Sequence, residues 1–104
     1  MNKVSNKTIK MYHGESLNFM YTPPDYCFTP DDEVTLTIKR RLRDTRPVMQ
    51  TKIDDICGNT IHINIPAYEM ERLPVGGYVY NIIVENNYIK WVIVPPSKLI
   101  IKEV

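Results

Sequence analysis

Apolar and polar residues alternate along most of this chain, and no long segment shows the spacing of an amphipathic helix. The clearest alternation is that of Val34, Leu36 and Ile38 with intervening threonines and a lysine. Since successive side chains of a strand point to opposite faces, this pattern predicts a strand with one buried face. The same pattern predicts further strands over 16–21, 60–65 and 78–85, and weaker ones over 8–13, 48–53 and the tail from Tyr88.

Proline, glycine, asparagine and aspartate separate these segments at intervals of roughly 8–12 residues, a spacing typical of β-sandwiches. We therefore expect an all-β fold, an immunoglobulin-like antiparallel β-sandwich of about seven strands. One short helical turn is expected within 66–73. Pro95 and Pro96 cannot donate to a ladder, so they predict a bend or an edge in the tail. The predicted core comprises Leu17, Phe19, Val34, Leu36, Ile38, Ile61, Ile63, Ile65, Tyr78, Tyr80, Ile82 and Val84.

Two of the four glycines, Gly76 and Gly77, stand directly before Tyr78. Immunoglobulin-like sandwiches often have a corner tyrosine here, whose hydroxyl donates to a backbone carbonyl a few residues upstream. Glycine before such a tyrosine permits positive φ and removes side-chain bulk. The segment therefore predicts a structural corner at 76–78. The alternative is that Tyr78 is an ordinary strand residue.

The chain has 104 residues and a formal charge of +1, which suits one domain over 1–104 and gives no general attraction to nucleic acid or membrane. The N-terminal sequence has no apolar stretch typical of a signal peptide, and no segment approaches the ~18 apolar residues of a membrane span. We expect a soluble protein made in a cytoplasm.

No combination of residues in the sequence indicates catalysis. His13 and His62 have no Ser-His-Asp spacing or glycine-rich phosphate loop near them, so each is interpreted as a surface or strand residue. Cys27 and Cys57 form no CxxC motif, and free thiols are expected, with a disulfide as the alternative because their loops share one end of the sandwich. The sequence thus predicts no enzyme, no cofactor and no metal site.

Charge is distributed unevenly between the two ends of the expected sandwich. Loops near 23–33 and 54–59 carry aspartates, whereas the loop at 40–47 carries Arg40, Arg41, Arg43 and Arg46. Such polarity suits docking against a complementary partner, because charge patterns set orientation. The alternative is a solvated loop paired with Glu69 and Glu71 at the same end. Nucleic-acid binding would need a wider basic surface with aromatic platforms, and the near-neutral charge argues against it.

The apolar tail over 99–104 is a second candidate contact, with Leu99 and Ile101 as its leading residues. A terminal strand beyond a proline break can add to the sheet edge of a neighbour. The alternative is that the tail closes this domain's own sheet, as the sandwich plan requires.

Three segments carry a resemblance to a known group of proteins. The stretches "IKMYHGESLNFMYT" (9–22), "VTLTIKRR" (34–41) and "LPVGGYVYNIIVE" (73–85) resemble the small immunoglobulin-like domains of tailed-bacteriophage virion proteins, including the N-terminal domains of baseplate upper proteins. This chain departs from the pattern in its longer, proline-rich loop "TPPDYCFTPDDE" (22–33).

The resemblance implies a non-enzymatic virion component, decorating a capsid or belonging to the tail or baseplate. Its partners would be other virion proteins, in several copies, and its location the phage particle. The alternative function is carbohydrate binding or adhesion, because Trp91 and the seven tyrosines are potential sugar platforms. An adhesin would display Trp91 and tyrosines in one groove.

Overall fold

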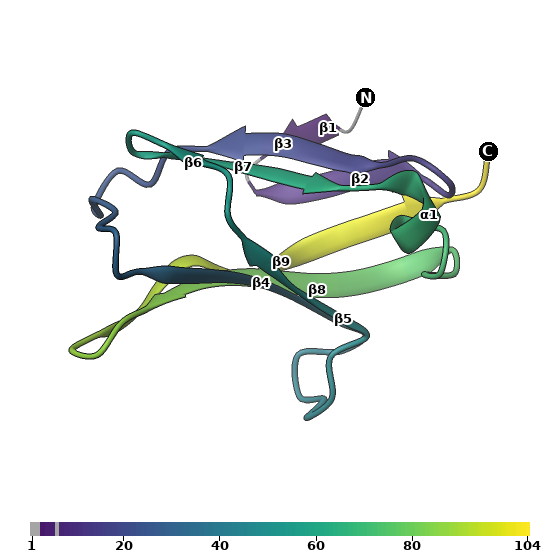
Figure 1. Cartoon of the computed structure of the whole chain (residues 1–104). Coiled ribbons are helices and arrows are strands. Elements are labelled where there is room, and N and C mark those ends of the chain that lie inside the picture. The colour runs from purple at the N-terminus through teal and green to yellow at the C-terminus, as the bar shows by residue number, and fades with distance from the viewer. Residues whose placement is uncertain (1–2, 6) are drawn as a thin grey trace.

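The computed structural model describes residues 3–5 and 7–104, and the described residues form nine strands and one short helix. Figure 1 shows the strands in two layers that face each other, with the helix at one end. In chain order the elements are β1 (Lys3–Ser5), β2 (Thr8–Tyr12), β3 (Leu17–Tyr21), β4 (Glu33–Lys39), β5 (Met49–Ile53), β6 (Ile56–Cys57), β7 (Thr60–Ile65), α1 (Ala67–Met70), β8 (Gly76–Glu85) and β9 (Lys90–Lys102).

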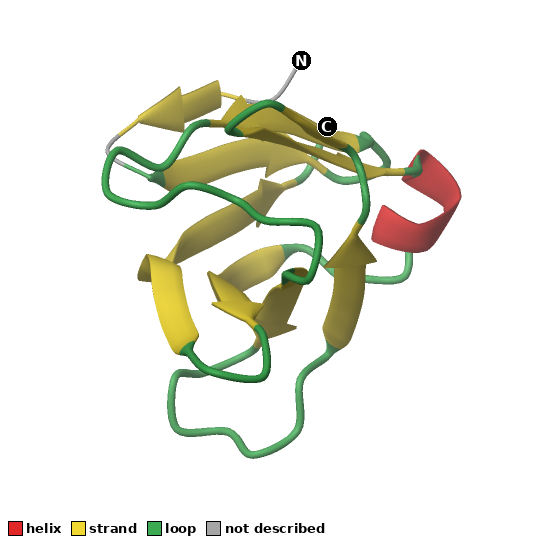
Figure 2. Ribbon diagram, turned by 60° about the vertical axis from the view of Figure 1, so that its left-hand side comes forward, coloured by secondary structure: helices red, strands yellow, loops and turns green. Residues whose placement is uncertain are grey.

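The fold is the predicted all-β sandwich. One sheet has the order β1-β2-β9-β8-β4-β5 and the other has the order β3-β7-β6. Figure 2 shows the strands from a second direction, with the helix at one side of them. If β3 to β9 are taken as strands B, C, C′, D, E, F and G, the sheets are B–E–D and G–F–C–C′, which is the immunoglobulin-like arrangement. The strand number exceeds the expected seven because β1 and β2 precede the seven strands β3 to β9.

One pair departs from the expected antiparallel plan. Strand β2 lies parallel to β9, with Ile9 opposite Leu99 and Met11 opposite Ile101. All other strand pairs among the described residues are antiparallel. A parallel pair arises because the first long strand and the last one run in the same direction and meet in the same sheet. No local pattern in the sequence predicts that β2 and β9 pair.

The core lies between the two sheets, where the alternating apolar residues meet. Eleven of the twelve predicted core residues are buried, and Phe19 is half-buried, its ring 6.5 Å from that of Tyr80 in an edge-to-face arrangement. The short helix adds Met70, and the turn after it adds Leu73. The other buried apolar residues that the prediction omitted are Ile9, Met11, Ile53, Ile93, Val94, Leu99 and Ile101.

The two prolines of the tail do not end its strand. Strand β9 continues through Pro95 and Pro96, and its register against β8 shifts at this point, because Tyr80 faces Ser97 while Ile82 faces Val94. The prolines therefore occupy a bulge, where a missing N–H removes no ladder hydrogen bond. The Oδ1 atom of Asn81, beside this bulge, is buried without a hydrogen-bond partner.

Hydrophobic burial between the sheets should dominate the free energy of unfolding. Ile63 is 1% exposed, so Ile63→Ala should lower that free energy by roughly 2–5 kcal/mol through lost burial and the cavity left behind. Met20, on the neighbouring strand, is 70% exposed, and Met20→Ala is the matched control with an expected change near zero. Urea unfolding followed by circular dichroism measures both. Equal destabilisation by the two variants would contradict this assignment of the core.

Candidate docking site

The segment before β8 forms a corner at the end of the sandwich that carries α1. The Tyr78 hydroxyl donates a hydrogen bond of 2.6 Å to the carbonyl of Pro74, four residues upstream. This is the bond that the corner hypothesis requires. The guanidinium carbon of Arg40, at the end of β4, lies 4.9 Å from the centre of the Tyr78 ring. The corner thus joins the β4–β5 loop to the start of β8 by a cation–π contact.

Only the first of the two glycines has a structural reason to be glycine. Gly76 has φ of 151°, and a Cβ atom built on it would lie 2.8 Å from Nη1 of Arg40. Its bare backbone therefore leaves the space that the guanidinium occupies over Tyr78. A Cβ atom on Gly77 would meet nothing within 4 Å, and its φ is not positive. The sequence-based hypothesis assigned the corner role to both glycines, and the contacts assign it to Gly76.

The four arginines of the predicted docking site do not share one environment. All four residues are exposed, but Arg40 lies over the Tyr78 ring at the corner, whereas Arg41, Arg43 and Arg46 lie on the loop between β4 and β5. We call residues 41–46 the arginine loop. No ion pair or side-chain hydrogen bond joins these three guanidinium groups to the rest of the described chain, so the expected alternative, pairing with Glu69 and Glu71, is absent there.

Hydrogen bonds within the arginine loop hold its shape. The carboxylate of Asp44 accepts a bond of 3.0 Å from the backbone N–H of Arg41, and the N–H of Asp44 donates back to the carbonyl of Arg41 at 3.1 Å. At the base, the N–H of Val48 donates to the carbonyl of Ile38 at 2.8 Å. Figure 1 shows the loop between β4 and β5 extending away from both sheets. The three free guanidinium groups are therefore displayed on a projecting turn, with exposed Leu42 among them.

The second candidate contact, the tail, is not a docking surface at the two residues named for it. Leu99 and Ile101 are 0% and 2% exposed. Their strand is paired on both sides there, with β2 and with β8. The tail closes the domain's own sheet because its alternating apolar residues gain more from burial in the core than from exposure.

The loops at the opposite end of the sandwich are joined by a polar network around Asp32. Its carboxylate accepts hydrogen bonds of 2.8 Å from the hydroxyl of Tyr26, the backbone N–H of Thr29 and the side-chain amide of Asn86. Burial alone would raise the pKa of Asp32, but these donors outweigh it and lower that pKa. Burial, and then the bond to Asp32, raises the pKa of Tyr26 to about 12. This aspartate is a structural anchor rather than a free charge.

Asn59 holds the same end together and was missed by sequence reasoning. Its side-chain amide donates to the carbonyls of Pro23 and Tyr26 at 3.2 and 2.6 Å, and its Oδ1 accepts from the backbone N–H of Phe28 at 3.0 Å. An asparagine in a turn gives no sequence signal for a partner some thirty residues away. The network confirms that the loops predicted to share this end do lie together.

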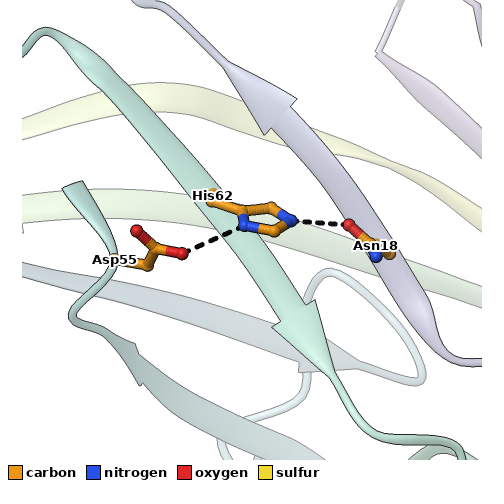
Figure 3. A network of polar contacts seen from close by, with 3 residues as sticks. All are labelled: Asn18, Asp55 and His62. Carbon is orange, nitrogen blue, oxygen red and sulfur yellow. Dashed lines mark hydrogen bonds and ion pairs between the residues drawn. The ribbon is translucent and has the colours of Figure 1, made fainter. Parts of the chain in front are cut away.

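The histidines are used within the fold. His62 lies on the outer face of its sheet, as expected, with Nδ1 3.0 Å from a carboxylate oxygen of Asp55 and Nε2 2.6 Å from Oδ1 of Asn18 (Figure 3). Both ring nitrogens of His62 are therefore within hydrogen-bond distance of side chains of the fold. The ring of His13 is hydrogen-bonded through Nε2 to the carbonyl of Glu71 at 3.0 Å. Cys27 and Cys57 are exposed free thiols, as expected.

A small pocket contains Trp91 together with two tyrosines. It has a volume of about 220 Å³ and lies between β9, the end of β3 and the loop after it. Trp91 is 49% exposed, whereas Tyr21 and Tyr26 are half-buried. The Nζ atom of Lys7 lies 5.9 Å from the centre of the Tyr21 ring, and Tyr26 packs edge-to-face on Phe28 at 5.4 Å. The pocket therefore presents one largely free aromatic ring.

No family model and no curated protein sequence matches this chain. Within the described residues, no cluster of three or more histidine, cysteine, aspartate or glutamate side chains has a geometry that could hold a metal ion. The only helix that the structure describes is a single turn, and no helix there could cross a membrane. The exposed surfaces described above are therefore the features that bear on function.

Replacing Gly76 by alanine should destabilise the protein by roughly 1–3 kcal/mol, because a side chain would be held at a sparsely populated φ. Gly77→Ala is the matched control and should change the free energy of unfolding little, since open space surrounds that position. Adding Arg40→Ala to Gly76→Ala should not restore stability, because it removes the clash and leaves the backbone strain. Full recovery in that double variant would show that steric overlap alone requires the glycine.

Asp32 should make stability depend on acid pH. A carboxyl group whose pKa is lowered by folding contributes stability that is complete above its unfolded pKa and is lost as pH falls through the folded value. The melting temperature should therefore fall on acidification below about pH 4, and Asp32→Asn should reduce that fall. Asp31→Asn, at the exposed neighbouring position, is the control. Identical pH profiles for Asp32→Asn and the wild type would contradict the role of the network.

Proposed function

We propose that this protein is a non-enzymatic structural module of a tailed-bacteriophage particle that docks onto another virion protein through the arginine loop. The observation that supports this proposal most is that Arg41, Arg43 and Arg46 project on a hydrogen-bonded turn. Their guanidinium groups have no ion-pair or hydrogen-bond partner in the described chain. Three unpaired cations on one turn favour an anionic partner surface, since opposite potentials steer and orient association.

Arginine suits this role better than lysine would. A guanidinium group presents a planar fork of donors that can hold a carboxylate through two hydrogen bonds, which fixes orientation as well as charge. Leu42, 62% exposed between Arg41 and Arg43, adds an apolar contact of the kind found at the centre of an interface. We expect the partner surface to combine carboxylates with an apolar depression.

The virion assignment comes from the sequence resemblance, and the fold is compatible with it. The three resembling segments form β2, β3, β4 and β8, which are strands of an immunoglobulin-like sandwich. This fold hosts many unrelated functions, so it supports the architecture and leaves the role to the exposed surface. Purified phage particles can be tested directly for the presence of the protein, whether it belongs to the capsid, the tail or the baseplate.

Carbohydrate binding is the second candidate, and the pocket beside Trp91 is the observation that favours it. Trp91, Tyr21 and Tyr26 do line one pocket, with Asp25 beside them as a carboxylate that can accept a hydrogen bond from a sugar hydroxyl. Against this function, Lys7 lies over the Tyr21 ring and Phe28 packs on Tyr26. Sugar platforms need open ring faces, so docking through the arginine loop has the stronger support.

Replacing Arg41, Arg43 and Arg46 together by serine should leave the melting temperature nearly unchanged, because exposed charges contribute little to folding stability. The same variant should be depleted from purified phage particles at least about tenfold by quantitative mass spectrometry, since charged interface contacts govern orientation and lifetime. Arg40 is kept, because it belongs to the corner.

Two comparisons make this experiment decisive. A triple lysine variant at the same positions keeps the charge and loses the fork geometry, so it should be incorporated at an intermediate level. Lys52→Ser, on a strand away from the loop, should be incorporated normally. Normal incorporation of the folded triple serine variant would exclude the arginine loop as the docking surface, and absence of the wild-type protein from particles would refute the virion assignment.

A further inference from the structure

One side of the sandwich has an open sheet edge. Strand β2 covers the outer edge of β9 only opposite residues 99–102. From residue 90 to residue 98, β9 is paired with β8 alone among the described strands. Backbone N–H and C=O groups on an open edge can pair with another extended chain. The facing sheet is also open on this side, because β3 is paired only with β7.

The open part of β9 displays apolar side chains. Trp91 and Val92 are each 49% exposed, and the adjoining hairpin carries Ile89 and Tyr88 at 41% and 94% exposure. Proteins usually protect open edges with charges, prolines or bulges. Here the prolines and the bulge protect the edge only after Val94, whereas the open strand β5 at the other side of the sheet carries exposed Gln50 and Lys52.

The pocket beside this edge offers space for a side chain. Its walls include Trp91, Val92 and Ile93 of β9, with Tyr21 of β3 and the two prolines Pro23 and Pro24 facing them. An extended segment running along the edge would place alternate side chains on the same side as this pocket. An open edge and a neighbouring pocket that can receive a side chain are together the two features of recognition by strand addition.

We propose that residues 90–94 of β9 bind an extended segment of a partner protein, which adds as a strand to the six-stranded sheet. The segment would lie in line with β2 and place one apolar side chain in the pocket beside Trp91. This surface lies apart from the arginine loop, and the inference does not depend on the proposed function.

The charges along this edge indicate what kind of partner segment would bind there. Lys7, Lys90 and Lys98 lie along the edge or the pocket, and Asp25 is the single acidic residue in the pocket lining. A segment with alternating apolar residues flanked by aspartate or glutamate complements this distribution. A second copy of this chain would bring the same lysines to its own edge, so like charges disfavour self-pairing. A bound sugar would not form a ladder of backbone hydrogen bonds with the open N–H and C=O groups of β9.

A displayed library of random twelve-residue peptides provides a probe for this surface. Peptides selected on the wild-type protein should alternate apolar residues, carry acidic flanks and lack proline at the centre. Val92→Lys places a charge on the open edge and should weaken binding of the selected peptides at least about tenfold, as should Trp91→Ala. Gln50→Lys makes the matched change on the other open edge and should leave binding unchanged.

Hydrogen exchange locates the bound peptide independently. Backbone amides within 90–94 should become protected on binding, and the triple serine variant of the arginine loop should bind the same peptides normally. Val92→Lys must keep the wild-type melting temperature, and Val92→Thr serves as a second variant that should retain binding. Three results would each overturn the proposal: selected peptides that bind Val92→Lys fully, dimerisation of the wild type through β9, or glycan binding that depends on Trp91.

Discussion

The structure depends on burying one face of β8 between the two sheets. Tyr78, Tyr80, Ile82 and Val84 alternate along this strand and are each at most 3% exposed. Strand β8 is also paired with both β4 and β9, so its inner face fixes the register of three strands together. A shift of one residue would turn all four side chains to solvent, which would cost far more than any surface contact could return. The burial of this face of β8 therefore positions the loops at both ends of the sandwich.

Each end of β8 supports a different kind of loop. At its start, Tyr78 anchors the turn from Pro74 and carries the Arg40 guanidinium on its ring, so that the base of the β4–β5 loop is fixed while the arginine loop projects freely. At its far end, Asn86 donates to Asp32 and ties the β8–β9 hairpin to the loop after β3. The charges of the first end are exposed, whereas a central charge of the second is consumed by hydrogen bonds. The two ends inferred from the sequence therefore differ in how their charged side chains are used within the fold.

The two surfaces proposed for partners would bind through different kinds of physical interaction. The arginine loop offers directional, salt-sensitive contacts, which select and orient a partner. The open edge of β9 offers backbone pairing and apolar burial, which give a longer-lived contact. A module of the proposed kind, which must enter an assembly correctly and then stay in it, would benefit from having both.

The sequence by itself determined the fold class, most of the core and the corner tyrosine, because these follow from local rules. Alternation assigned eleven buried residues correctly, since the period of a strand is fixed by its geometry, and Tyr78 forms the predicted bond to the backbone upstream. Tertiary structure alone decided which residues make contacts within the fold and which stay exposed without such contacts. Arg40 and Arg41 are neighbours and both are exposed, but only Arg40 lies over the Tyr78 ring, and Leu99 and Ile101 are buried in a strand that β2 and β8 flank. Asn59, Asn86 and the parallel β2–β9 pair gave no sequence signal, because each depends on a partner distant in the chain, brought near only when the two sheets pack.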